Sequence, residues 1–225
     1  MRQQQQQNNQ QQVRQQSTEN QDAAVAPNTQ RAGQRAGEMS KATLWRPEFE
    51  HDACGTGFIA HMDGLRSHAI IKDALEILVR LAHRGGTGSD PDTGDGAGVL
   101  LQIPDQFFRK HTGIHLPKEG AYAVGMFFLP LDEEVCRRAQ TGIETIAKEE
   151  AFTIIGWRTV PTNLHACGYG AWASVPAVRQ LFVSWKENDL PADVRLFVLR
   201  KRIEKAMKEQ GRDVYVPSLS NKTIV

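Results

Sequence analysis

The sequence predicts a layered α/β fold, with helices packed outside a core of strands, on two observations. First, residues 99–103 and 122–129 are almost entirely apolar, which is typical of strands buried on both faces. Second, long segments between the predicted strands have apolar residues three and four positions apart, the spacing of amphipathic helices. Periodicity alone leaves two arrangements open: a doubly wound sheet and a sandwich of two stacked sheets.

The first predicted elements lie between residues 57 and 98. Residues 57–61 are a short apolar strand. Ser67 is a suitable N-cap for a helix that Gly85-Gly86 ends. The apolar stripe of this helix is expected to comprise Ile71, Leu75, Leu78 and Leu81/Ala82. A glycine-rich loop, residues 85–98, then leads into the strand at 99–103.

Asp132 is the expected N-cap of a second helix, after the strand at 122–129. Its apolar stripe comprises Val135, Cys136, Ala139, Ile143, Ile146 and Ala147. The later elements are expected to be a strand at 152–157, a loop at 161–173, a short helix at 176–185, a strand at 194–199 leading into a basic helix that ends at Gly211, and strands at 214–218 and 223–225. The sequence stops inside an apolar run, so we expect the domain to be incomplete at its C-terminal end.

Residues 1–40 differ in composition from the rest of the chain. They are rich in glutamine, asparagine and small polar residues, and such a segment buries too little apolar surface to offset the entropy of ordering its backbone. We expect 1–40 to be a disordered Gln-rich tail; a self-associating tract is the alternative. No apolar run follows Arg2, as a secretory signal would require, and Glu19, Asp22 and Glu38 argue against a transit peptide.

Charge and cysteine content exclude several classes of partner. Once the four arginines and three acidic residues of the tail are set aside, 23 basic and 23 acidic residues remain, so nothing favours nucleic acid or an anionic membrane. The longest apolar run, residues 121–131, is shorter than the roughly 20 residues that cross a bilayer. Cys54, Cys136 and Cys167 match no zinc or redox spacing. We expect a cytoplasmic domain without a metal.

Cys54 stands at the start of a predicted strand and is followed by Gly55 and Gly57. A lone cysteine is most often a buried, inert residue. The alternative is that removal of residues 1–53 frees the α-amine of Cys54, with a pKa of about 7.7–8, to act as the base for its own thiol, with a pKa of about 8.5. The residues alone leave both interpretations open.

The loop at 83–98 invites a ligand-binding interpretation that its spacing does not support. As a calcium loop it places Gly94 at the third acidic position and Leu101 where a bidentate glutamate belongs. As a phosphate loop its glycines lead into a strand and not into a helix N-terminus. A tight connection that requires positive φ angles explains the glycines better.

Several blocks of sequence, in order and at compatible spacing, resemble the start of the glutamate synthase large subunit. The resemblance runs from about Trp45 to Val225. The blocks are Cys-Gly-x-Gly-Phe at 54–58, Leu-x-His-Arg-Gly-Gly at 81–86, Ser-Asp-Pro-Asp-Thr-Gly-Asp-Gly-Ala-Gly-Val at 89–99, Gln-Ile-Pro-x-x-Phe-Phe at 102–108, Gly-Trp-Arg-Thr-Val-Pro-Thr at 156–162, Leu-Phe-Val-Leu-Arg-Lys-Arg at 196–202 and Ser-Leu-Ser-x-x-Thr-Ile-Val at 218–225.

The resemblance implies a class II glutamine amidotransferase with a four-layer αββα sandwich, the fold of N-terminal nucleophile (Ntn) hydrolases. It places the nucleophile on Cys54 and the end of a propeptide on Ala53, so that 41–53 are the remainder of the propeptide and 54–225 a partial amidotransferase domain. Gly55, Arg84, Asp95 and Gly96 are implied to support the pocket.

In that family the thiolate attacks the side-chain amide of glutamine, giving a thioester and ammonia. The ammonia passes to a synthase region containing FMN and an iron–sulfur cluster, where 2-oxoglutarate becomes glutamate. The resemblance implies no cofactor in this segment. Beside glutamine, the expected partners are the synthase region and, as a further candidate, a small reductase subunit.

Two departures from the family pattern keep an alternative open. No residue here matches the family's oxyanion-hole Asn-Gly or its glutamine-binding Arg and Asp, and segment 161–176 matches loosely. Losing one oxyanion donor typically costs about 10²–10³ in rate, so we expect this polypeptide alone to be inactive. The alternative function is therefore a truncated, inactive remnant that at most binds a partner. Cys136 is expected in the core, and Cys167 in a loop with no assigned role.

Overall fold

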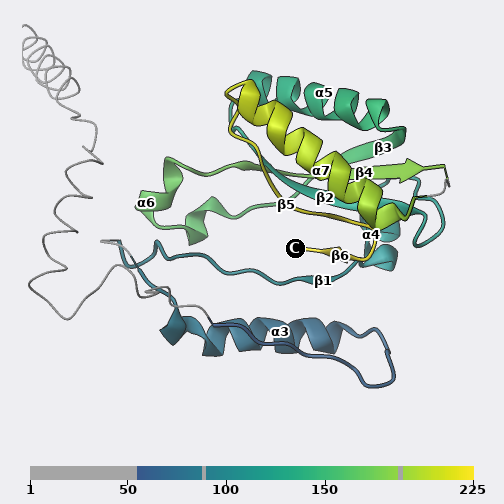
Figure 1. Ribbon diagram of the computed structural model, residues 1–225. Helices are drawn as coiled ribbons and strands as arrows, with labels where there is room; N and C mark the ends of the chain where they lie inside the picture. The colour runs from purple at the N-terminus through teal and green to yellow at the C-terminus, as the bar shows by residue number, and fades with distance from the viewer. Residues whose placement is uncertain (1–54, 88–89, 187–189) are drawn as a thin grey trace, which may run out of the picture. The chain divides into compact units, whose positions relative to one another are not determined.

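The computed structural model describes residues 55–87, 90–186 and 190–225 (Figure 1). Cys54, the predicted tail at 1–40 and the predicted propeptide remainder at 41–53 lie outside these residues. By its internal contacts the chain divides into residues 1–52 and residues 53–225. The helices and strands of the described residues lie in the second unit.

A four-stranded antiparallel sheet forms the centre of this unit. Its strands are β2 (Tyr122–Leu129), β3 (Phe152–Thr159), β4 (Ala177–Trp185) and β5 (Tyr215–Ser220), in the order β3-β4-β2-β5. Every neighbouring pair is antiparallel. The doubly wound arrangement that the periodicity left open is therefore excluded, because it requires a mostly parallel sheet.

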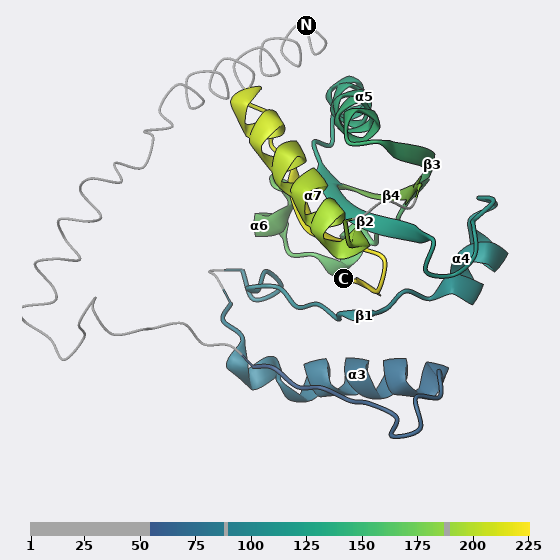
Figure 2. The ribbon, with the colours of Figure 1, turned by 45° about the vertical axis from the view of Figure 1, so that its right-hand side comes forward.

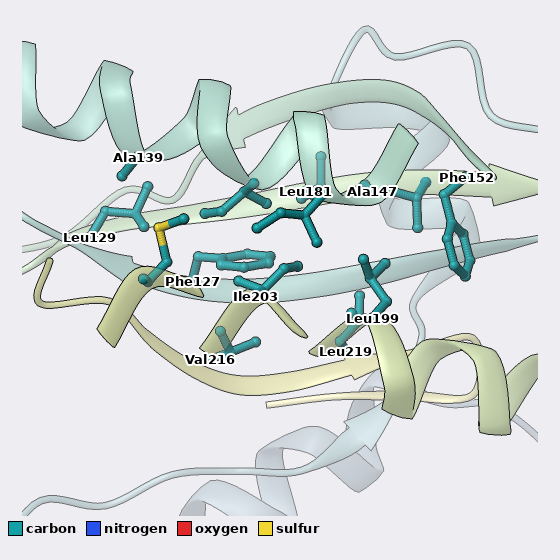
Figure 3. Close-up of a cluster of buried hydrophobic side chains, with 14 of the residues drawn as sticks. Phe127, Leu129, Ala139, Ala147, Phe152, Leu181, Leu199, Ile203, Val216 and Leu219 are labelled. Atoms are coloured by element: carbon teal, nitrogen blue, oxygen red, sulfur yellow. The ribbon is translucent and has the colours of Figure 1, made fainter. Parts of the chain in front are cut away.

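Two helices, α5 (Glu133–Glu149) and α7 (Ala192–Glu209), cover one face of this sheet (Figure 2). The predictions for α5 are confirmed: Asp132 caps it by accepting a hydrogen bond from the Val135 amide at 2.9 Å, and its stripe is buried from Cys136 to Ala147. Figure 3 shows how Phe127 and Leu181 of the sheet pack between the two helices.

A second, two-stranded sheet packs on the other face. Its antiparallel strands are β1 (Leu101–Gln102) and β6 (Thr223–Ile224). Ile224 joins Val124 and Phe182 of the central sheet in a separate buried cluster, to which helix α4 (Asp105–His111) adds Phe108. Of the two predicted arrangements the stacked sheets are therefore the ones that form. The helix layer of α5 and α7 on the central sheet corresponds to one of the two outer layers of an αββα sandwich.

The expectation of a fully buried strand at 99–103 is wrong in extent. Only Leu101 and Gln102 pair as strand β1, and Leu100 is 64% exposed. Within the described residues this short strand pairs with β6 alone, and Leu101 and Ile103 pack into the buried cluster between the two sheets, whereas Leu100 does not.

The expected helix at 176–185 is also wrong, since these residues form the central strand β4. Arg179 and Gln180 interrupt the apolar pattern and gave the segment an amphipathic appearance. In the sheet, Leu181 and Phe182 face opposite clusters, because successive side chains of a strand point to opposite faces. Hydrogen-bonded neighbours on both sides, β2 and β3, fix the strand conformation.

The expected strand at 194–199 is replaced by the first half of α7. The buried positions of this helix are Arg195, Leu196, Leu199, Ile203 and Met207, at helical spacing. Arg195 is buried because its guanidinium donates to the carbonyls of Lys186 and Glu150 and lies 4.9 Å from the centre of the Phe152 ring. The predicted end of the helix is confirmed, with Gly211 at φ +63° just beyond it.

The first helix, α3 (His68–Arg80), starts as predicted, because the Ser67 hydroxyl accepts from the Ala69 amide at 3.0 Å. It ends before Gly85, with a 3₁₀ turn (Ala82–Arg84) between. Two expectations here are wrong. Leu75 is 50% exposed, and residues 57–61 form no strand, with Phe58 92% exposed. The partly covered positions of α3 are Ile70, Ile71, Ala74, Ile77 and Leu78.

The remaining short elements lie in the loop expected at 161–173. They are a 3₁₀ turn (Leu164–Ala166) and the single-turn helix α6 (Tyr169–Trp172). Strands β5 and β6 agree with the expected strands at 214–218 and 223–225 to within two residues.

Candidate functional site

The first described residue, Gly55, lies against Arg84, the last residue of the 3₁₀ turn that follows α3. A Cβ atom placed on Gly55 would lie 3.1 Å from Cβ of Arg84 and 3.1 Å from Cδ2 of Leu81. Such contacts are tighter than side chains normally make, so the backbone approaches Arg84 closely because residue 55 has no side chain. The structure thus brings together two of the predicted site residues.

Gly57 continues this contact along the helix. Its Cβ would lie 2.8 Å from Cγ2 of Ile77, on the partly covered face of α3. The segment that begins at Gly55 therefore runs back along α3, and glycine is needed at both positions for that approach. Cys54 adjoins this segment in the chain but lies outside the described residues, so the geometry of its thiol is a prediction.

Asp95 closes the base of the loop that follows Arg84. Its Oδ2 accepts a hydrogen bond from the Gly86 amide at 2.7 Å, and its own amide donates to the Gly86 carbonyl at 3.1 Å. Thr87 and Gly94 form the next bridge. Gly96 has φ +96°, which confirms the expected need for positive φ in this loop.

Three predicted site residues thus take part in two contacts: Gly55 lies against Arg84, and Asp95 binds Gly86, two residues after Arg84 in the chain. Gly96 follows Asp95 directly. The Asp95 carboxylate accepts a hydrogen bond from a backbone amide, that of Gly86. Asp95 therefore joins the two ends of the loop, by binding Gly86.

Asp90 was not named as a site residue from the sequence, yet it is buried and its carboxylate accepts three hydrogen bonds. Its carboxylate accepts from the Thr93 hydroxyl at 2.7 Å, from the Asp92 amide at 3.1 Å and from the Gly170 amide at 3.1 Å. These bonds, the one from Gly170 first, hold the pKa of Asp90 below its ordinary value. No local motif could have identified this role, because Gly170 lies 80 residues away in the chain.

Other candidates lie where the sequence predicted. Cys136 is 4% exposed in the core, and Cys167 is exposed in the loop. Nδ1 of His83 lies 2.9 Å from the carbonyl oxygen of Arg80, as expected for a histidine at a helix end. Within the described ranges, no group of three His, Cys, Asp or Glu side chains is arranged to hold a metal ion.

A cavity of about 260 Å³ lies away from these residues, beside the second sheet. It is lined by residues that include Arg66, Gln102, Glu119, Tyr122, Asn221 and Lys222. None of the predicted site residues lines it. Among the described helices, none is both long and apolar enough to cross a membrane.

Stacked antiparallel sheets with a layer of helices on the larger one agree with the fold that the resemblance implied. Residues 54–225 match the family of class-II glutamine amidotransferases, and the chain belongs to this family. The expected Ntn-hydrolase-like fold class is thereby confirmed.

The curated relatives are glutamate synthases, as the sequence blocks indicated. Over 193 residues the chain is 47% identical to the protein named glutamate synthase [NADPH] large chain of Bacillus subtilis, covering 84% of this chain and 13% of that protein. It is 40% identical to ferredoxin-dependent glutamate synthase 1 of Arabidopsis thaliana, covering 84% and 12%. A third relative, the NADPH enzyme's large chain of Azospirillum brasilense, is 38% identical, covering 84% and 13%.

Proposed function

We propose that residues 54–225 belong to a glutaminase in which Cys54 is the N-terminal nucleophile, freed by removal of residues 1–53. The observation that supports this most directly is the start of the family match at Cys54, whose neighbour Gly55 lies against Arg84. The propeptide would then consist of the Gln-rich tail at 1–40 and the remainder at 41–53.

The reaction follows from the chemistry of an N-terminal cysteine. The α-amine has a pKa of about 7.7–8, close to neutral pH, so it can accept the thiol proton directly or through one water. The thiolate attacks the side-chain carbonyl carbon of glutamine and forms a C–S bond. The C–N bond then breaks, and the amine returns its proton so that ammonia leaves. Water hydrolyses the γ-glutamyl thioester to glutamate and restores the thiol.

Within this proposal the described residues support the nucleophile and do not react. The absence of side chains at Gly55 and Gly57 lets the backbone that leads from Cys54 lie on α3. The stem of Arg84 packs at that point, which places a permanent positive charge close to the start of the domain. Asp95 and Gly96 hold the loop that follows Arg84.

For the whole protein we propose the activity that the relatives' names state, glutamate synthesis, fed by ammonia from this domain. This chemistry uses FMN and an iron–sulfur cluster for electron transfer, and the residues described here do not fit the cluster. A cluster needs three or four cysteine thiolates, whereas Cys136 is buried in the core and Cys167 is exposed in a loop. We therefore assign both cofactors to a synthase region, with a small reductase subunit as a further partner and the cytoplasm as the compartment.

Labelling with a glutamine analogue tests the nucleophile. A diazo-ketone analogue should modify Cys54 in the mature protein before Cys136 or Cys167, and N-terminal sequencing should start at Cys54. Cys54→Ser should remove glutamine-dependent activity and keep ammonia-dependent synthesis in the complete enzyme. An active enzyme that retains Ala53, or equal loss of both activities in the variant, would refute the proposal.

A further inference from the structure

We propose that Asp90 is a positioning residue for the glutaminase site, because it fastens the outer end of the loop after Arg84 to the segment at 168–170. The contacts of Asp90 support the link between the two segments, whereas the effect on catalysis rests on the proposed function. The family pattern suggested the loop at 90–98 as a support of the nucleophile in general; the contacts assign a particular role to Asp90.

The burial of Asp90 is unusual for its surroundings. Among the described positions from 55 to 100 it is the only buried residue, at 5% exposure. A carboxylate is costly to bury unless hydrogen bonds compensate it. Here the compensation comes from its own turn, through Thr93 and Asp92, and from the Gly170 amide across the fold.

The partner segment is shaped to receive this carboxylate. A Cβ on Gly168 would lie 2.2 Å from Oδ2 of Asp90 and 2.4 Å from Oγ1 of Thr93, so only glycine fits. The Gly168 amide also donates to the Asp92 carbonyl at 3.1 Å. Side chain and backbone therefore both join the two segments.

The contact also supplies something that α6 lacks. Amides at the start of a helix have no partner within the helix, and a Ser, Thr, Asp or Asn side chain usually caps them. Gly168 occupies the N-cap of α6 and makes no side-chain cap. Asp90 provides the missing acceptor from another part of the chain, by binding the Gly170 amide.

The consequence for the site follows from how the loop is tied. Its base is held by Asp95 on Gly86, two residues after Arg84, and its outer end by Asp90 on Gly170. With Asp90 held on Gly170 and Asp95 held on Gly86, the turn at 90–95 is fixed at both ends, and Gly86 has little freedom to shift. Loss of the outer tie should loosen the base as well, and displace Arg84 from the nucleophile.

Amide hydrogen exchange by NMR on the full chain tests this coupling. Asp90→Ala and, from the opposite side of the contact, Gly168→Ala should each speed exchange at Gly170 and also at Gly86. Asp92→Ala is the matched control, because it removes a neighbouring exposed carboxylate and keeps the backbone contacts. Faster exchange at Gly170 alone, with Gly86 as in the control, would overturn the proposal.

Chemical labelling of the complete mature enzyme gives the functional readout. In Asp90→Ala the concentration of the diazo-ketone glutamine analogue that half-saturates Cys54 labelling should rise about 10- to 100-fold, since small displacements of a site cost this much. Labelling by iodoacetamide, which needs no glutamine pocket, should stay within about twofold of the control. Equal changes with both reagents would show a general structural role and refute positioning.

Two further outcomes separate possible causes of failure. If the analogue does not label Cys54 in the unmodified protein, the proposed function is wrong, while the exchange data still decide whether the loop is coupled. If Asp90→Ala loses protection throughout α5, it has unfolded. Thr93→Val then decides, because it removes only the hydroxyl that donates to Asp90 at 2.7 Å.

Discussion

The Asp105–Tyr122 pair offers a stability prediction that its contacts quantify. Oδ1 of Asp105 accepts from the Tyr122 hydroxyl at 2.9 Å and from Arg109 at 3.0 Å, while Oδ2 accepts from Arg109 at 2.8 Å. Tyr122 is 1% exposed and belongs to the cluster between the two sheets. The pair therefore connects α4 to the first residue of the central strand β2.

Removal of either partner has a different cost. Tyr122→Phe loses one hydrogen bond to a charged acceptor that keeps Arg109, which should lower the free energy of unfolding by about 1.5 kcal/mol. Asp105→Ala also leaves the Tyr122 hydroxyl buried without its acceptor, so its cost should reach about 3–4 kcal/mol. Arg109 adds little, because its half-exposed guanidinium keeps the carbonyls of Leu116 and Pro117.

The double variant, Asp105→Ala with Tyr122→Phe, has no buried hydroxyl that lacks an acceptor. Its cost should therefore fall short of the sum of the single variants by about 2 kcal/mol. Urea unfolding of the full chain, followed by tryptophan fluorescence, measures all three values. Tyr215→Phe, at a tyrosine that is 60% exposed, is the matched control and should change the free energy by less than about 0.5 kcal/mol. Additive costs would show that the pair does not interact in the folded protein.

Two other predictions concern the core and the response to acid. Ile143→Ala should destabilise by about 2–5 kcal/mol in the same assay, because Ile143 is fully buried between α5 and the sheet; exposed Thr141→Ala should cost less than about 0.5 kcal/mol. Hydrogen bonds hold the pKa of Asp105 and Asp90 below the ordinary value, Arg109 being the main cause at Asp105 and Gly170 at Asp90. Their stabilisation is complete above the unfolded pKa of about 4 and should be lost as pH falls below it. Unfolding at pH 7 and pH 3 should show a smaller acid loss in Asp105→Asn; an equal loss would contradict this.

The sequence predicted those elements whose signals are local. β2 has the expected bounds, and α5 begins directly after its expected cap, Asp132, because an uninterrupted apolar run and a capped 3.6-residue stripe each specify one structure. The short helix α4 was missed although Pro104, Asp105 and the positive-φ Gly113 mark its ends.

The errors at β4 and α7 have a common physical reason. Neither segment has apolar residues at a clear helical or strand spacing, so contacts with residues far away in the chain decide its structure. β4 becomes a strand because β2 and β3 bond it on both sides. Residues 194–199 become helical because Leu196 and Leu199 then face the same cluster as Ile203. The contact of Asp90 with Gly170 could not be predicted for the same reason, because the two residues are 80 positions apart in the chain.

Stability and the proposed site depend on different parts of the described chain. Both buried clusters draw their members from Leu101 onward, and the segment from Gly55 to Leu100 contributes no side chain to either. Polar contacts hold that segment to the rest, among them Asp90 with Gly170 and Arg66 with Glu119, at 2.5 Å. Substitutions in the clusters should therefore lower stability, whereas substitutions at these polar contacts should move the site within a protein that stays folded.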